Sequence, residues 1–313
     1  MGVEIPKTSY SGAIRQISFG SANKVTMGGA NSFPFHVFEG EMPNPPRIAM
    51  EVYDHPPEDW PEAALAPFKD VVDDPVKWAG KCIEEYGAEI ICLQLKGLDP
   101  NGKDDPVEDA VATASRVAEA VEVPLIVWGC GNDEKDAEAL KAICEACEGR
   151  GLMVGPVTEN NYSRVGAAAI AYQHVVAAMT PIDINLAKQL NILLGNLGVP
   201  DDRIVIDPNS AALGYGIEYT YSVMERIRMA ALLQEDERLA FPIICNMARE
   251  VWKVKEVGIP QQEDPKLGDP EERGIMMEAM TASLLLNAGA DLLIMRHPEA
   301  IKRTRKLISD MMG

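Results

Sequence analysis

The chain has 313 residues, of which 47% are hydrophobic and 25% are charged, a balance typical of a folded globular protein and unlike that of a disordered one. Acidic residues outnumber basic ones 48 to 29, and the formal charge of -19 repels phosphate backbones and anionic membrane surfaces, so neither nucleic acid nor a membrane is an expected partner. The start, MGVEIPKTSYSG, has no apolar signal-peptide core, and no stretch is apolar enough to span a membrane. The six cysteines are scattered and suggest no disulfide framework. We therefore expect a cytoplasmic protein.

The first 46 residues differ in pattern from the rest of the chain. Segments 13–20 (AIRQISFG) and 24–29 (KVTMGG) each read as a short strand, and an aromatic segment, 31–40 (NSFPFHVFEG), follows them. We therefore expect residues 1–46 to form an N-terminal hairpin and arm, and residues 47–313 to form the main domain.

From Arg47 onward, short apolar runs that favour strands alternate with helical patterns. The predicted strands are 47–53, 89–95, 124–129, 151–155, 174–179, 203–207, 241–246 and 291–296. Because these runs are continuously apolar, they suit a parallel sheet that helices cover.

Helices are predicted between the strands, at 75–86, 106–121, 133–148, 161–172, 182–197, 217–234, 270–288 and 298–311. Glycines in EEYGAE, LGVPDDR and NAGADL stand where a left-handed residue commonly ends a helix. A doubly wound open sheet would also alternate, but eight units without a GxGxxG turn after the first strand favour closure. The predicted fold class is α/β, a (β/α)8 TIM barrel of about 250 residues with an N-terminal hairpin and arm extension.

Strong sequence signals for zinc, nucleotide or hydrolase chemistry are missing from this chain. Its one CxxC, Cys144 and Cys147, lies in a helical pattern with no second thiol pair nearby, which favours two packed helix residues over a redox or iron–sulfur site. We predict no metal ligands here.

Polar residues gather where the predicted strands end, which in a barrel is the face that carries function. They are Asp54, His55, Gln94, Lys96, Cys130, Asn132, Asp133, Glu159, Asn160, Asp207, Asn209, Asn246, Arg249, Glu250, Arg296 and His297, and the long connection 253–268 belongs to the same face. Each one alone is better explained as a helix cap or a solvated loop residue, but together they predict a binding surface. No acid and base are spaced to define a proton path and no nucleophile has an activator beside it, so no catalytic residue is predicted.

Apolar residues accompany this polar set. They are Trp128, Tyr215, Met247 and Trp252 after the strands, and Phe33, Phe35 and Phe38 in the arm. Ordinary loop packing explains them as well as a flat hydrophobic ligand or a subunit interface does.

Three segments resemble a known family: 159–191 (ENNYSRVGAAAIAYQHVVAAMTPIDINLAKQLN), 203–228 (RIVIDPNSAALGYGIEYTYSVMERIR) and 25–36 (VTMGGANSFPFH). They are similar to the small subunit of the corrinoid iron–sulfur protein, which is also the delta subunit of acetyl-CoA decarbonylase/synthase, and the likeness covers nearly the whole chain. The resemblance implies a heterodimer in which a large subunit carries the 4Fe-4S cluster and most contacts to the corrinoid (cobalamin), while this barrel covers one side of it.

The resemblance also implies a methyl carrier. A methyltetrahydrofolate methyltransferase would supply the methyl group, and acetyl-CoA synthase/carbon monoxide dehydrogenase would receive it, in the reductive acetyl-CoA (Wood-Ljungdahl) pathway. The chain has neither the thiols for a cluster nor the DxHxxG motif of proteins that give a histidine to cobalt, since Asp54-His55-Pro56-Pro57 is not that motif. The subunit is therefore expected to be non-catalytic and to shield a nucleophilic cobalt(I) that must be uncovered for methyl transfer.

By their place in the barrel, and not by known contacts, seven residues are expected nearest the corrin: Asn31, Phe33, Phe35, Asn209, Tyr215, Met247 and Trp252. The alternative is a pterin-binding methyltransferase acting on methyltetrahydrofolate, in which Asn160, Asp207 and Asn209 would hold the pterin. A metal-dependent aldolase-like barrel would need a lysine or a metal cluster, and Lys96 alone is thin support for it.

Overall fold

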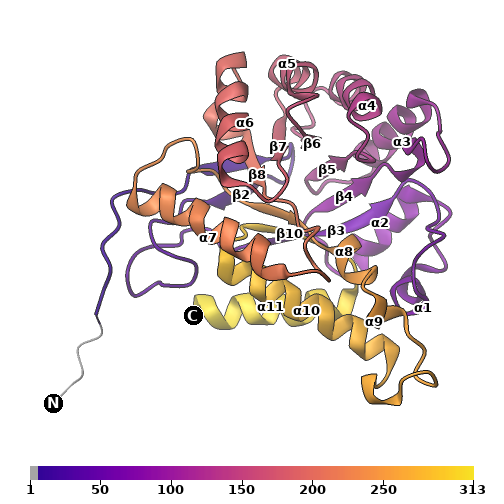
Figure 1. The fold of residues 1–313 in the computed structure, drawn as a ribbon. Coiled ribbons are helices and arrows are strands. Elements are labelled where there is room, and N and C mark those ends of the chain that lie inside the picture. The colour runs from indigo at the N-terminus through magenta and orange to yellow at the C-terminus, as the bar shows by residue number, and fades with distance from the viewer. Residues whose placement is uncertain (1–5) are drawn as a thin grey trace.

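Eight parallel strands form a ring at the centre of the molecule, and helices surround it (Figure 1). In the computed structural model, which describes residues 6–313, these strands are β3 (Arg47–Tyr53), β4 (Ile91–Gln94), β5 (Leu125–Trp128), β6 (Met153–Val157), β7 (Val175–Met179), β8 (Ile204–Asp207), β9 (Ile244–Asn246) and β10 (Leu292–Met295). Their order is β8-β7-β6-β5-β4-β3-β10-β9. A parallel bridge between Ile206 and Ile243, with a 2.9 Å hydrogen bond from Ile206 N to Pro242 O, links β8 to β9. The predicted TIM barrel and its eight predicted strands are confirmed.

Helices alternate with these strands on the outside of the ring. They are α1 (Glu62–Leu65), α2 (Pro75–Glu84), α3 (Val107–Ala120), α4 (Asp133–Ala146), α5 (Tyr162–Tyr172), α6 (Ile184–Leu197), α7 (Ile217–Leu233), α8 (Ala248–Trp252), α9 (Lys255–Gly258), α10 (Pro270–Ala288) and α11 (Pro298–Met312). Short 3-10 turns are η1 (Ala66–Phe68), η2 (Lys96–Leu98), η3 (Asp201–Arg203) and η4 (Pro265–Leu267). Helices α6 and α10 end at the left-handed glycines Gly198 and Gly289, as LGVPDDR and NAGADL predict.

The apolar core has two layers. One layer lies between the ring and its helices, where large side chains such as Trp78 and Phe68 are buried. The other fills the inside of the ring, with residues such as Ile90, Ile126 and Leu292. The two layers bury both sides of each strand, which explains the continuously apolar strand sequences.

A hairpin closes the amino end of the ring. Its strands, β1 (Gln16–Phe19) and β2 (Val25–Gly28), are antiparallel, and Ile17 and Met27 join the core inside the ring. Gly20 N donates to Gly151 O at 2.7 Å, and residue 151 precedes β6, so the hairpin lies where the barrel strands begin. The predicted hairpin strands are confirmed, while residues 1–5 of the predicted extension lie outside the described residues.

Truncating Met27 to alanine tests how firmly the hairpin anchors the barrel. Met27 is fully buried, so Met27→Ala should lower the free energy of unfolding by about 2–5 kcal/mol, as measured by urea denaturation. Thr26→Ala is the matched control, because Thr26 points to the other face and bonds Ser18 at the surface; its cost should stay below about 1 kcal/mol. Equal losses in the two variants would contradict the anchoring role.

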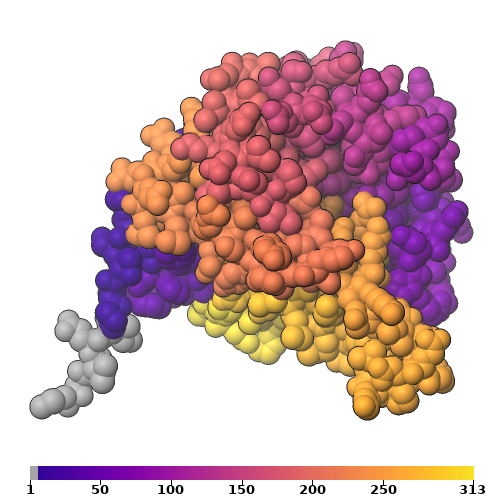
Figure 2. Space-filling view, in the orientation of Figure 1, coloured from indigo at the N-terminus to yellow at the C-terminus, as the bar shows by residue number. Residues whose placement is uncertain are grey.

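The connection between β9 and α10 projects from the body of the barrel, at the lower right of Figure 2. It includes α8, α9 and η4. The Arg273 guanidinium holds it by donating to the carbonyl oxygens of Ile259 at 2.8 Å, Gly268 at 2.9 Å and Leu267 at 3.1 Å. The predicted long connection therefore has a defined course. Within residues 6–313, none of the helices has the length and apolarity needed to cross a bilayer.

Candidate functional site

A buried ion pair fills the centre of the carboxyl end of the barrel. Glu51 in β3 accepts a hydrogen bond from Nε of Arg296, which directly follows β10, and their side chains are 0% and 2% exposed. The Arg296 guanidinium also lies over the Trp60 indole, 3.6 Å from the ring centroid, and donates to the Tyr53 hydroxyl at 3.3 Å. Because both charges are removed from water, each is stabilised in the folded protein by the opposite charge of the other. The barrel mouth is thus filled by the chain's own side chains.

Polar residues from two strands that are not neighbours in the ring meet beside this pair. Gln94 Nε2, at the end of β4, donates to Asn246 Oδ1, at the end of β9, over 3.2 Å. Gln94 Oε1 is buried and has no hydrogen-bond partner in the described part of the chain. Burial and the nearby charge of Arg249 lower the pKa of Lys96 to about 8. The mouth is polar, but it is closed.

Glu278 in α10 ties two loops of this rim together. Its carboxylate accepts from the backbone nitrogens of Arg296 (2.5 Å) and His297 (3.0 Å), and from Trp252 Nε1 (2.9 Å). Burial raises the pKa of Glu278 to about 7 in spite of these hydrogen bonds. Glu278 therefore positions the segments that follow β9 and β10.

A second pair of polar residues lies at the end of β8, where Asp207 is buried and Asn209 is half-buried. Asp207 Oδ1 accepts from Asn209 N at 2.9 Å, and burial raises the pKa of Asp207 to about 7. Asn209 has a left-handed backbone (φ 65), which asparagine tolerates better than most residues. Asp207 thereby fixes the direction in which the following loop leaves the barrel.

The raised pKa of Asp207 predicts a pH dependence of stability. Between about pH 4 and pH 7 the folded chain holds a proton at Asp207 that the unfolded chain has lost, so the free energy of unfolding falls as pH rises, by about 1.4 kcal/mol for each unit of pKa shift. Asp207→Asn should remove this part of the slope when urea unfolding is compared at pH 5 and pH 7.5. Asp202→Asn, an exposed control, should keep it, and an unchanged slope in Asp207→Asn would refute the assignment.

Several polar residues at the strand ends cap the backbone, as predicted for them singly. Asp54 accepts from Lys96 N at 2.9 Å and from Gly97 N at 3.0 Å. Asn132 is the N-cap of α4 and accepts from Lys135 N at 3.1 Å. These side chains hold the loops that follow the strands.

A cavity of about 410 Å³, which we call the side groove, lies beside the filled mouth. The ends of β6, β7 and β8 and the 186–193 part of α6 border it. Its polar lining consists of Asp133, Thr158, Glu159, Asn160, Thr180, Gln189 and Asn209. Its apolar lining consists of Met179, Pro181, Leu186, Leu190 and Leu193. This volume and mixed lining are typical of a small-molecule site.

The seven residues predicted to lie nearest the corrin fall into two groups. Asn209, Tyr215, Met247 and Trp252 lie at the carboxyl end of the barrel, as expected, whereas Asn31, Phe33 and Phe35 lie at the amino end. Phe33 packs against the cluster that includes Ile14 and Ala240, and residue 240 precedes β9. The two groups therefore do not border one common ligand site on this chain, and the contact of each residue with a corrin stays a prediction.

The four residues at the carboxyl end differ in exposure. Tyr215 is 92% exposed, whereas Met247 and Trp252 are 0% and 4% exposed and belong to the core. Asn209 lines the side groove, together with Asn160, which was predicted for a pterin site.

Sequence reasoning missed several residues of this end. Glu51 could have been noticed as a lone acid inside the apolar strand RIAMEVY. Thr180 and Glu278 carry no such signal, because a threonine after a strand and an acid in a helix are ordinary.

All six cysteines are buried free thiols. Cys144 lies in α4 and Cys147 is its C-cap, which fits packed helix residues. Burial raises the pKa of Cys144 to about 12, which disfavours the reactive thiolate. In residues 6–313 no group of three or more His, Cys, Asp or Glu side chains is arranged to hold a metal ion.

A family model described as CO dehydrogenase/acetyl-CoA synthase delta subunit matches residues 16–306. The chain is 38% identical to the acetyl-CoA decarbonylase/synthase complex subunit delta of Archaeoglobus fulgidus, over 98% of this chain and 70% of that protein. It is also 38% identical to the subunit delta of Methanopyrus kandleri, over 93% of this chain and 71% of that protein.

Solved structures with a similar fold include dihydropteroate synthases. The enzyme from Xanthomonas albilineans has a TM-score of 0.57 and 15% identity, with 95% of this chain and 97% of that chain covered. The 7,8-dihydropteroate synthase of Vibrio fischeri has a TM-score of 0.57 and 11% identity, with 94% and 96% covered. At such low identity the likeness shows the fold alone.

Proposed function

The chain belongs to the CO dehydrogenase/acetyl-CoA synthase delta subunit family, and from this premise we propose that it is the delta subunit of an acetyl-CoA decarbonylase/synthase complex. In that role it is the small subunit of a corrinoid iron–sulfur protein and acts as a carrier component, without a bond-forming step on its own side chains. The observation that carries the proposal is the match over residues 16–306, which spans the hairpin and nearly the whole barrel.

The filled barrel mouth supports a covering role. Barrel enzymes use the carboxyl end of the ring to hold substrate, but here Glu51, Gln94 and Arg296 occupy that position and are buried. The end of the barrel therefore offers a rigid surface that excludes water. Such a surface suits a reactive centre that a partner subunit holds against it.

A weakly bonded polar atom tests whether this end fits a corrinoid. Asn209 is half-buried and lines the side groove, and among the described residues its Nδ2 donates only to Met179 Sδ, at 3.7 Å; because a thioether is a weak acceptor, the groove has bonding capacity that the chain hardly uses. Asn209 would hold the group, Tyr215 would lie beside it, and Met247 and Trp252 would support the surface from behind. When bound, the corrinoid supplies the cobalt centre that carries the methyl group.

The assignment of partners follows from the same proposal. The large subunit would hold the 4Fe-4S cluster and most of the corrinoid, and this chain would form a heterodimer with it in the cytoplasm. A methyltetrahydrofolate methyltransferase would deliver the methyl group, and acetyl-CoA synthase/carbon monoxide dehydrogenase would accept it.

Co-expression with the large subunit tests the proposal. An affinity tag on this chain should recover a heterodimer whose visible spectrum shows a bound corrinoid, while the isolated chain should bind neither methyltetrahydrofolate nor cobalamin tightly. A chain that remains a monodisperse monomer in the presence of the large subunit would overturn the assignment. Tight binding of methyltetrahydrofolate by the isolated chain, with methyl transfer to free cobalamin, would instead favour the pterin-binding methyltransferase.

A further inference from the structure

We propose that a cavity at the amino end of the barrel binds a phosphate group, free or esterified to a small metabolite. This cavity, which we call the amino-end pocket, has a volume of about 410 Å³. It lies between the turn of the β1–β2 hairpin, the connections from α4 to β6 and from α5 to β7, and the residue that precedes β8. The inference goes beyond the proposed function and does not depend on it, because the pocket and the filled mouth lie at opposite ends of the ring.

One wall of the pocket is a glycine-rich connection. Gly149 and Gly151, which follow α4, have left-handed backbones (φ 80 and 61), and they are exposed and half-buried, respectively. Neither backbone N–H has a hydrogen-bond acceptor among residues 6–313. No atom of another segment lies within 4 Å of the point where a Cβ of Gly149 would stand. Such a turn suits phosphate, because a ligand can approach unused backbone N–H groups without meeting a side chain.

Two basic side chains border the same pocket without a counter-charge. Lys24 lies in the hairpin turn and is exposed, while Arg203 precedes β8 and is half-buried. The nearby Arg15 and Arg238 both pair with Asp201, whereas Lys24 and Arg203 form no ion pair or side-chain hydrogen bond within the described chain. An arginine without a partner can donate two parallel hydrogen bonds to a phosphate.

Two features of the pocket oppose an anion, and both are weaker than the features that favour one. Glu148 adds a carboxylate to the lining, but it is exposed and the two cations outnumber it. Helices α4 and α5 also end here, at the C-caps Cys147 and Gln173, and a helix carboxyl end favours cations. In the described structure, however, neither Lys24 nor Arg203 donates a hydrogen bond to a carbonyl oxygen of these helix ends.

The rest of the pocket suits a polar ligand body. Its volume is that of a small-molecule site and exceeds the needs of a phosphate ion alone. Ser21, Tyr172 and Gln173 also line it, and these neutral side chains can form hydrogen bonds with hydroxyl groups. A phosphate ester of a polyol or sugar therefore fits the lining better than an apolar phosphate ester does.

Isothermal titration calorimetry of the full chain at pH 7.5 and constant ionic strength tests the inference. Inorganic phosphate and glycerol 3-phosphate are the two probes, and both should bind, while glycerol should not. Tighter binding of glycerol 3-phosphate would identify an ester as the ligand, and equal affinity would identify free phosphate. Arg203→Gln should weaken binding of both probes about tenfold, the effect of losing a hydrogen bond between charged groups.

Arg226→Gln is the matched control for Arg203→Gln. It changes the net charge by the same amount, and Arg226 is exposed on α7 outside the pocket lining, so this variant should bind both probes like the unchanged chain. Lys24→Gln provides a second test that folding does not confound, because Lys24 is an exposed turn residue. This variant should unfold at the same urea concentration as the unchanged chain without phosphate, and should bind phosphate about three- to tenfold more weakly.

Three results would overturn the inference. The first is an unchanged chain that binds neither probe. The second is binding that Arg203→Gln and Lys24→Gln both retain in full, which would place the anion elsewhere on the chain. The third is equal weakening by Arg226→Gln, which would show a general response to net charge. The recovery of a corrinoid-containing heterodimer would be unaffected by any of these results, so the proposed function would stand or fall separately.

Discussion

Replacing Arg296 with methionine is expected to lower the free energy of unfolding by about 3–5 kcal/mol, measured by urea denaturation at pH 7. The substitution removes the positive charge from a side chain that is 2% exposed and leaves the Glu51 carboxylate, 0% exposed, without a counter-charge. It also removes the stacking of the guanidinium on Trp60 and its hydrogen bond to Tyr53. Methionine fills much of the same volume, so the loss reports mainly on charge.

Three comparisons isolate the charge effect. The double variant Glu51→Gln/Arg296→Met should be more stable than Arg296→Met, because it has no buried carboxylate without a partner. The deficit of Arg296→Met should also shrink as pH falls, because adding a proton to the Glu51 carboxylate would neutralise the buried charge that this variant leaves without a partner. Arg303→Met, which breaks an exposed pair with Glu272, should cost at most about 1 kcal/mol. Equal stability of the single and double variants would contradict this explanation.

The fold could be predicted because its signals are local. Each strand is a continuous apolar run, and the helices carry their own caps, such as Asp74 before Pro75 and the glycines Gly198 and Gly289. The differences arise at strand ends. The run predicted at 241–246 forms a strand only from Ile244, because Pro242 has no N–H for the ladder and serves as an acceptor for Ile206 N.

The site could be predicted only in part, because it depends on contacts between distant segments. The carboxyl end was expected to carry the polar residues, and it does. The Glu51–Arg296 pair joins residues 245 positions apart, and no local pattern shows that it fills the mouth. The aromatic segment 31–40 fits a binding arm equally well at either end of a barrel, and the pairing of β1 and β2 under the ring places it at the amino end.

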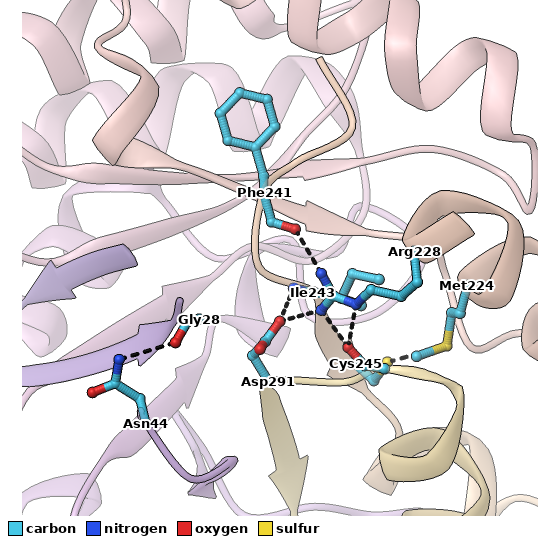
Figure 3. A network of polar contacts seen from close by, with 9 residues as sticks. Gly28, Asn44, Met224, Arg228, Phe241, Ile243, Cys245 and Asp291 are labelled. Atoms are coloured by element: carbon cyan, nitrogen blue, oxygen red, sulfur yellow. Dashed lines mark hydrogen bonds and ion pairs between the residues drawn. The ribbon is translucent and has the colours of Figure 1, made fainter. Parts of the chain in front are cut away.

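Replacing Arg228, a second buried arginine, should destabilise the fold about as much as replacing Arg296. Arg228 lies in α7 and holds, at the amino end of the barrel, the segments that lead into β9 and β10 (Figure 3). It pairs with Asp291 and donates to Gly289 O at 3.2 Å and to Phe241 O at 3.3 Å. The Asp291 carboxylate in turn accepts from Ile243 N at 2.7 Å. Arg228→Met would leave a largely buried carboxylate and two carbonyls without their donor, so a loss of about 3–5 kcal/mol in the free energy of unfolding is expected.

The position of Arg228 also predicts where the barrel would weaken. Ile243 forms the bridge to Ile206 that links β9 to β8, so loosening the Asp291 contact should loosen the seam of the ring first. Hydrogen exchange in Arg228→Met should therefore rise more in peptides covering 240–246 than in peptides covering β5, which is paired on both sides. Arg226→Met, two residues earlier on α7 and exposed, is the matched control and should change neither stability nor exchange. Exchange that rises uniformly around the ring in Arg228→Met would mean that the seam does not depend on this contact.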